Sequence, residues 1–241
     1  DVAQNTQYFD GLGRPKQIVS KQQSPAQNDM VSVTVYDGFG RESTQYLSYT
    51  TTVGDGYYKA TALTDQNTFN SAQFPGEQYY YNQINYESSP LNRELNSYAA
   101  GINWVGASRG ITQQYLVNQI TDSVRIWNIA FTAGSIPVST TNYAAGTLYK
   151  EITTDEANHQ LIQFKDVSGH IILKKVQQAN VPGTAHVGWL CTYYVYDSLQ
   201  NLRFVIQPQA VVAINSNWTI TTPIANELCF RYEYDQRNRM I

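Results

Sequence analysis

The sequence has few of the features on which nucleic-acid-binding, membrane-spanning and nucleotide-using proteins depend. Its 241 residues include 16 lysines and arginines against 19 aspartates and glutamates, and no basic block that would follow a phosphate backbone. No stretch approaches the roughly 20 apolar residues that span a membrane as a helix. There is neither a Gly-rich phosphate loop before a helix nor a Gly-x-Ser-x-Gly elbow. These absences argue against nucleic-acid binding, a membrane span, and the commonest nucleotide and serine-hydrolase sites.

Cysteine is scarce, and its two positions are related. Cys191 and Cys229 each lie six residues before an aspartate, in matching Leu-Cys-x-x-Tyr-x-Tyr-Asp strings. In consecutive hairpins such equivalent strands are next-but-one neighbours, about 9–10 Å apart. A disulfide requires Cα atoms about 4.4–6.8 Å apart. We therefore predict two free, buried cysteines that pack as small hydrophobic residues.

Tyrosine, by contrast, is abundant, with 19 residues against eight phenylalanines. Together with many Gln, Asn, Thr and Ser residues, this composition is typical of β-sheets with partly polar faces. The chain begins at Asp1 without a methionine or a signal-like stretch. With little lysine and much tyrosine, asparagine and threonine, we expect a processed piece of an exported bacterial protein, extracellular or at the cell surface.

One short motif recurs along the chain and indicates a repeat architecture. It reads Tyr36-Asp37-Gly38-Phe39-Gly40-Arg41 in its fullest form. An aspartate favours the first corner of a turn because its carboxylate accepts the N–H two residues on, and a Gly or Asn three residues later tolerates a positive φ. The flanking residues alternate as in strands, so each copy predicts a β-hairpin. The copies begin at Phe9, Tyr36, Lys165, Tyr196 and Tyr234.

The candidate functional residues are therefore structural ones. We expect the repeat arginines to pair with the neighbouring aspartate or to stack on tyrosine. Gln200 is the residue least suited to its corner. The residues predicted to form these turns are Asp10, Gly13, Arg14, Asp37, Gly40, Arg41, Asp166, Gly169, Asp197, Asp235, Asn238 and Arg239.

The copies predict three regions. Residues 1–50 hold two hairpin repeats, 51–145 an irregular insertion, and 146–241 three further hairpins. The insertion contains a degenerate copy at Tyr86–Arg93 and an expected short helix over 60–70. Further strands are expected over 113–117, 123–131 and 146–152. The last copy lacks a return strand, so we expect a longer parent chain that continues with more repeats.

Catalytic, metal and cofactor sites are not predicted. Asp155, Glu156 and His159 form the densest acidic group, but the string reads as another hairpin turn and not as a glycosidase pair. His159, His170 and His186 are scattered, and the repeat aspartates lack the alternate acids of a calcium loop. We expect a non-enzymatic protein without cofactor or metal. The tyrosines and four tryptophans leave one alternative open, a carbohydrate- or cell-surface-binding module.

These motifs carry a family resemblance. The Tyr-Asp-x-x-Gly-Arg units resemble the YD repeats of Rhs proteins, which also occur in teneurins and in the cocoon-forming subunits of insecticidal Tc toxins. The strings Gln7–Pro15, Tyr86–Arg93 and Asp122–Trp127 are similar to the leading repeat region of Rhs proteins from Bacteroidetes. The resemblance implies an all-β ribbon that spirals into a shell, which encloses or displays a C-terminal toxin. No toxin domain and no autocleaving core motif is visible here, so the resemblance implies a wall segment or end cap. Its expected partners are the other repeats and the C-terminal effector. In the binding alternative, surface glycans are a further partner.

Overall fold

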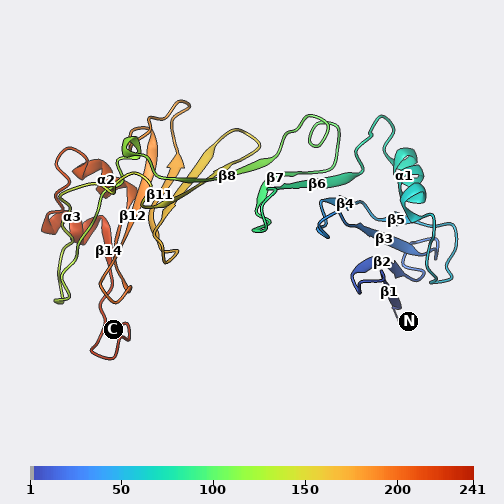
Figure 1. The fold of residues 1–241 in the computed structure, drawn as a ribbon, viewed down its shortest axis with the longest axis horizontal. Coiled ribbons are helices and arrows are strands. Elements are labelled where there is room, and N and C mark those ends of the chain that lie inside the picture. Colours follow the sequence, from blue (N-terminus) through green and yellow to red (C-terminus); the bar gives the residue numbers. More distant parts are fainter. Residues whose placement is uncertain (1–2) are drawn as a thin grey trace. The chain divides into compact units, whose positions relative to one another are not determined.

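In the computed structural model, residues 3–241 form a β-protein with fourteen strands and three α-helices among the described residues (Figure 1). The strand pairs with a defined register are antiparallel, and most are joined as consecutive hairpins. The expected all-β fold class is confirmed. The chain divides into two compact units, the first ending at Thr112 and the second comprising Gln113–Ile241. The predicted division into three regions stays a prediction.

The first unit is a meander interrupted by one helix. Its strand order is β1-β2-β3-β4-β6-β7, with β8 beginning beside β7, while β5 pairs with β3 off this path. The elements are β1 (Asn5–Phe9), β2 (Pro15–Ser20), β3 (Met30–Val35), β4 (Thr44–Tyr46), β5 (Tyr49–Thr50), α1 (Ala62–Gln73), β6 (Tyr81–Tyr86), β7 (Glu94–Tyr98) and β8 (Ile111–Val117).

Helix α1 lies against β3 and β5, over the small core of this unit (Figure 1). Val19, Val31, Tyr49 and Ala62 form that core. The buried face of α1 is largely polar, and Gln66 donates a hydrogen bond of 3.1 Å to the Tyr80 carbonyl. The sequence expectation of a short helix is therefore confirmed, displaced by two to three residues at its ends.

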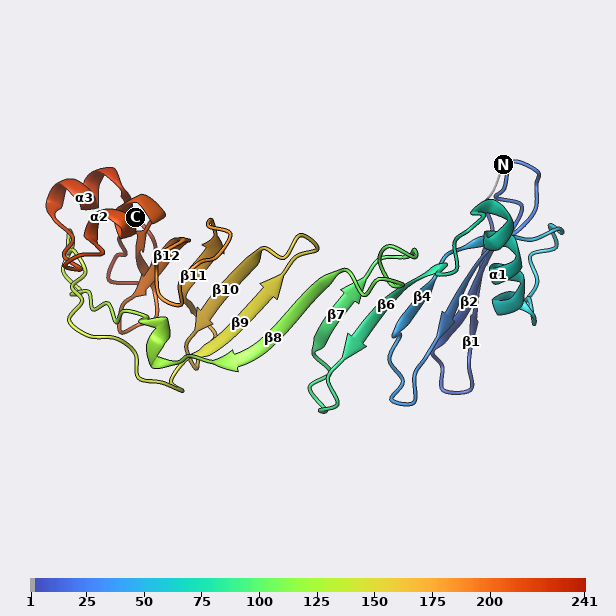
Figure 2. The same ribbon diagram turned by 90° about the horizontal axis from the view of Figure 1, so that it is seen from above.

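The strand order of the second unit is β8-β9-β10-β11-β12-β13-β14. Two helices between β13 and β14 lie together beside this sheet (Figure 2). The elements are a 3₁₀ turn (Ile120–Asp122), β9 (Tyr149–Thr154), β10 (Gln160–Lys165), β11 (Ile171–Gln177), β12 (Trp189–Tyr196), β13 (Leu202–Ile206), α2 (Pro208–Ile214), α3 (Thr222–Glu227) and β14 (Cys229–Arg231).

A larger core holds the second unit together. On β12 the side chains alternate as a strand requires, with Cys191, Tyr193 and Val195 buried and Thr192 and Tyr194 half-buried. Four of the five residues of β13 are buried. Phe204 and Ile206 of this strand share the core with Ala210, Val211 and Ile214 of α2. The sequence expectations did not include these two helices.

One expected strand is wrong. Residues 123–131 form no strand and make only isolated bridges, at Arg125 with Asn142 and at Asn128 with Val138. Val124 and Trp127 nevertheless pack into the core of the second unit. Their apolar alternation reflects burial of an irregular segment and not sheet pairing. The strands expected over 113–117 and 146–152 correspond to β8 and β9.

The cysteines lie on next-but-one strands, since β13 separates β12 from β14. Both thiols are free. Cys191 is buried as expected, whereas Cys229 is only half-buried because β14 lies at the end of the strand order.

Candidate functional site

The recurring motif forms one local structure, which we call the repeat turn and number from position one, the acidic residue, to position five. In the first copy the Asp10 N–H donates to the Arg14 carbonyl (2.9 Å) and the Gly13 N–H to the Asp10 carbonyl (3.0 Å). The Asp10 Oδ1 accepts the N–H groups of Leu12 and Arg14. Gly13, at position four, has a φ of 75°. This is the three-residue hairpin loop whose closing residue must be left-handed.

The same hydrogen bonds recur in every complete copy. The first residue is Asp10, Asp37, Asp155, Asp166, Asp197 or Asp235, and its carboxylate accepts the N–H groups of positions three and five. Position four has a positive φ each time, whether it is Gly13, Gly40, Asn158, Gly169, Gln200 or Asn238. The sequence motif thus corresponds to one backbone geometry, which even Gln200 adopts.

The degenerate copy at Tyr86–Arg93 forms the same kind of turn with two more residues in its loop. Glu87 donates its N–H to the Arg93 carbonyl, and its longer side chain binds the Arg93 guanidinium at 2.7 Å. Asn92 supplies the left-handed residue, with a φ of 52°.

Position five supplies a side-chain donor to the second carboxylate oxygen. Arg14, Arg41 and Arg239 do this with Nε at 2.8 to 2.9 Å. At the other copies His159, His170 or Asn201 takes the same place. Backbone N–H groups and these donors hold the pKa of Asp10, Asp37, Asp155 and Asp235 below the usual value, and the Arg93 side chain lowers the pKa of Glu87 to about 2.

Position five also contacts the next turn. Figure 2 shows the loops after β1, β3 and β6 along one edge of the first unit. The Arg14 guanidinium lies 4.3 Å from the centre of the Tyr36 ring, and the Tyr36 hydroxyl donates to the Pro15 carbonyl at 2.8 Å. Arg41 repeats this, stacking 4.8 Å from the Tyr86 ring and donating to the Glu87 carbonyl at 3.1 Å. Each arginine therefore closes its own turn and binds its neighbour.

The second unit uses other residues for the same contacts. The His170 ring stacks on Tyr196, with centroids 4.7 Å apart. Asn201 binds the side chain of Asn238 in the following turn, and the Tyr234 hydroxyl donates to the Leu202 carbonyl at 3.2 Å. The residue before the acid is thus an aromatic ring that contacts the previous turn at Tyr36, Tyr86, Tyr196 and Tyr234. Thr154 and Lys165 take this place before Asp155 and Asp166.

Arg239 is the exception. Its side chain is 69% exposed and pairs with its own Asp235 at 2.7 Å. Within residues 3–241 it contacts no following repeat turn, because Asp235 begins the last copy.

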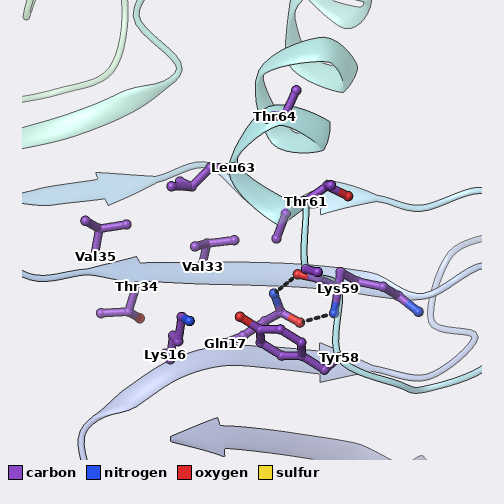
Figure 3. A pocket seen from close by; sticks show the side chains of 12 residues that line it. Lys16, Gln17, Val33, Thr34, Val35, Tyr58, Lys59, Thr61, Leu63 and Thr64 are labelled. Carbon is purple, nitrogen blue, oxygen red and sulfur yellow. Dashed lines mark hydrogen bonds between the residues drawn. The ribbon is translucent and has the colours of Figure 1, made fainter. Parts of the chain in front are cut away.

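A second cluster fixes the segment between β5 and α1. The amide of Gln17, itself 2% exposed, donates to the Lys59 carbonyl and accepts the Lys59 N–H, as Figure 3 shows. The Lys59 ammonium pairs with the fully buried Asp29 at 3.1 Å, and Asp29 also accepts the Gly56 N–H. This clamp borders a cavity of about 360 Å³ whose walls include Lys16, Tyr58 and Val33. Its lining includes no carboxylate, imidazole or thiol. Its titratable groups are Lys16, Tyr58 and Lys59, and the Lys59 ammonium is held by its ion pair with Asp29.

Other candidate chemistry is sparse in the described part of the chain. Asp155 and His159 belong to a repeat turn, and Asp155 uses its oxygens to hold that turn. No three His, Cys, Asp or Glu side chains among residues 3–241 are grouped as metal ligands. Nor does any helix in this range have the length and apolarity to cross a membrane.

Comparisons with known proteins agree with the fold. A family model described as "Domain of unknown function (DUF6443)" matches residues 1–117. No curated protein matches the sequence. Among solved structures, the crystal structure of TcdB2-TccC3 without its hypervariable C-terminal region matches with a TM-score of 0.53 and 17% identity, over 99% of this chain. The present chain spans 10% of that chain. At this identity the similarity establishes a shared fold.

Proposed function

We propose that this chain is a structural repeat module that builds part of the β-strand shell of a longer Rhs-type protein. The observation that carries the proposal is the contact between successive turns, as in Arg14 on Tyr36 and Arg41 on Tyr86. Stacked repeats gain stability from such nearest-neighbour contacts. Successive hairpins also pair their strand edges, which removes exposed edges from the interior of the sheet.

The fold comparison supports a place within a larger protein. TcdB2-TccC3 was solved without a hypervariable C-terminal region, and this chain matches a tenth of it. By analogy, the shell of the parent protein would enclose or display a C-terminal effector. The composition and the sequence resemblance favour an exported bacterial protein, extracellular or at the cell surface, of the kind found in Bacteroidetes. The module would act through its geometry and not by catalysis.

Limited proteolysis of the full parent protein tests this function. If the module is part of an enclosing wall, the C-terminal region resists protease in the native protein and is digested after mild denaturation. A variant with Arg14→Ala and Arg41→Ala opens the contacts between turns, so the C-terminal region becomes sensitive. Equal digestion of that region in the native protein and in the variant would contradict enclosure.

The alternative, glycan binding through exposed tyrosine and tryptophan, finds less support on the surface. Trp127 and Trp189 are 8% and 6% exposed, and Trp104 and Trp218 are partly buried. The well-exposed Tyr57 and Tyr149 belong to different units. A glycan array tests this alternative. It predicts that the unaltered protein binds glycans and that a double variant with Tyr57→Ala and Tyr149→Ala loses this binding.

A further inference from the structure

The tips of the repeat turns in the first unit carry exposed apolar side chains. Position three is Leu12 in the first turn and Phe39 in the second, and Leu91 precedes the left-handed residue of the degenerate turn in the same way. Leu12 and Phe39 are each 78% exposed, and Leu91 is 69% exposed. These turns join β1 to β2, β3 to β4 and β6 to β7, and their loops lie along one edge of the unit (Figure 2).

The turn itself does not require an apolar side chain at position three. Only the backbone N–H of this position takes part in the turn, as a donor to the acid. Ala157, Ser168 and Arg237 hold the same place in other copies and form the same hydrogen bond. An exposed apolar row that folding does not need is typical of a surface that contacts another molecule.

Glycine at position two is a second feature without a role inside a single copy of the chain. Gly11 and Gly38 occupy this position in the first two turns, and neither has a positive φ. A Cβ at either place would meet no atom within 4 Å. Glu156, Val167 and Ser198 carry a side chain there and form the same turn. A glycine that neither the backbone nor the packing demands lets another chain approach the backbone closely.

These two tips, Gly11-Leu12-Gly13 and Gly38-Phe39-Gly40, are complementary to each other, and we call them the tip pair. They are about 9–10 Å apart, since successive hairpins are separated by two strand spacings. A two-fold axis between them places the first tip of one copy opposite the second tip of another. Each apolar side chain then lies over a bare glycine, and this reciprocity is what a symmetric dimer interface requires.

Charge does not oppose contact between two such edges. Asp10 and Asp37 are paired with Arg14 and Arg41 within their own turns. The tip pair therefore lies above neutralised ion pairs, and two copies escape the repulsion that like charges cause across an interface. None of the described turns of the second unit combines a glycine at position two with an apolar residue at position three.

We propose that the tip pair docks against the tip pair of a second copy of this chain. Leu12 of each copy packs over Gly38 of the other, and Phe39 over Gly11. Two turn tips per copy form a contact smaller than the roughly 1,200–2,000 Å² of stable interfaces, so the dimer is weak, with a dissociation constant of about 10–1,000 µM. The dimer does not rest on the shell function, because the contacts between successive turns are complete within one copy.

Sedimentation equilibrium of the 241-residue chain, at concentrations that bracket this range, tests the proposal. We expect the average mass to rise from that of a monomer towards that of a dimer. The double variant Leu12→Ser, Phe39→Ser should raise the dissociation constant at least about tenfold, because it removes both apolar side chains from the contact. The matched control is Leu91→Ser, Leu199→Ser, which changes two exposed turn-tip leucines outside the tip pair and should leave the dissociation constant unchanged.

A second variant changes the dimer without disturbing the monomer. Gly11→Ala, Gly38→Ala adds two methyl groups that meet no atom within one copy, so thermal unfolding should not be impaired. The methyl groups fill the space that the other copy's side chains need, so dimerisation should weaken at least about tenfold. A chain that stays monomeric throughout the range overturns the proposal and assigns the tips to a different partner. A dimer that either tip-pair variant leaves intact, or that the control weakens as much, also overturns it.

Discussion

At the scale of single residues, the repeat turn depends on two positions. The acid at position one holds the loop through its side chain, and position four must be left-handed. Glycine reaches positive φ without steric cost, whereas a residue with a side chain pays about 1–2 kcal/mol. Asn158 and Asn238 reduce that cost as asparagine usually does, but Gln200, at a φ of 65°, does not.

Gln200→Gly should therefore stabilise the protein. We expect an increase of about 1 kcal/mol in the free energy of unfolding, measured by urea denaturation, because the strain at this corner is removed. Gln160→Gly, on strand β10, is the control and should destabilise by about 0.5–1 kcal/mol. A loss of stability in Gln200→Gly would show that its side-chain contact with Ser168 outweighs the backbone strain.

The acid at position one carries several hydrogen bonds. Asp37→Ala removes acceptors for the N–H groups of Phe39 and Arg41 and the partner of the Arg41 guanidinium. We expect a lower free energy of unfolding in urea denaturation, because hydrogen bonds to a charged group stabilise a protein more than those between neutral groups. Asp37→Asn retains the acceptor for the N–H groups and should lose less. Equal losses in both variants would assign the whole effect to the ion pair.

His186 makes the second unit sensitive to moderate acid. Burial, with Lys175 and Arg125 nearby, lowers the pKa of His186 to about 4, and its Nε2 lies 2.7 Å from the Tyr193 hydroxyl. Unfolded histidine titrates near 6.5, so only the unfolded chain takes up a proton between pH 6.5 and 4. Stability should fall by up to about 3 kcal/mol as the pH drops through this window.

Urea denaturation at pH 7, 6 and 5 measures this effect, and His186→Gln should flatten the pH dependence. His159→Gln changes an exposed histidine and is the control. The turn carboxylates do not interfere above pH 5. Their pKa values are lowered, so the stability they contribute is complete above the unfolded value near 4 and is lost only at lower pH. An unchanged slope in His186→Gln would refute the assignment.

At the scale of elements, neighbouring hairpins of the first unit are joined by cation–π contacts between an arginine and a tyrosine ring. Arg41 bonds Asp37, stacks on Tyr86 and donates to Glu87, which a planar guanidinium can do at once and a lysine cannot. Arg41→Lys should therefore destabilise the protein by about 1 kcal/mol.

A double-mutant cycle with Arg41→Ala and Tyr86→Leu isolates the contact between the turns. We expect a coupling free energy of about 0.5–1 kcal/mol, measured by urea denaturation. The pair Arg239→Ala and Tyr86→Leu is the control, because the two side chains have no contact and should be additive. Zero coupling for the first pair would mean that the hairpins are held by backbone pairing alone.

The hairpins could be predicted from the sequence because the residues that determine them are close together in the chain. Asp at position one and Gly or Asn at position four specify the five-residue repeat turn, and β12 alternates as expected. Pairing with the acid and stacking on tyrosine were expected only of the arginines at position five, although His170 and Asn201 make the same kinds of contact. A donor side chain at that spacing was the available signal. Helices α2 and α3 begin with Pro208 and Pro223 in their first turns, a signal for helix starts that the repeat pattern obscured. The mistaken strand over 123–131 depended on packing against distant residues, which no local pattern reveals.

At the scale of the whole molecule, the two units differ in how much core they possess. The first has four fully buried apolar residues in its cluster, whereas the second has a cluster that extends from Val124 to Ala225. Buried apolar area is the main source of folding free energy, so the second unit should be the more stable.

Hydrogen exchange by mass spectrometry measures this difference directly. We expect amides of β11 and β12 to exchange at least about tenfold more slowly than those of β2 and β3, which corresponds to about 1.4 kcal/mol in opening free energy. The substitution Val31→Gly should speed amide exchange across the first unit and leave the exchange rates of β11 and β12 unchanged. Equal protection throughout would indicate a single cooperative structure.

The contacts between turns have a direction. The Tyr36 and Tyr234 hydroxyls donate to the carbonyls of Pro15 and Leu202, which precede them in the chain. Each hairpin thus meets a partner that has already been synthesised when it leaves the ribosome. The sheet of each unit can therefore be laid down vectorially, with every finished hairpin serving as the template for the next, so that each newly made strand edge stays unpaired only until the following hairpin emerges.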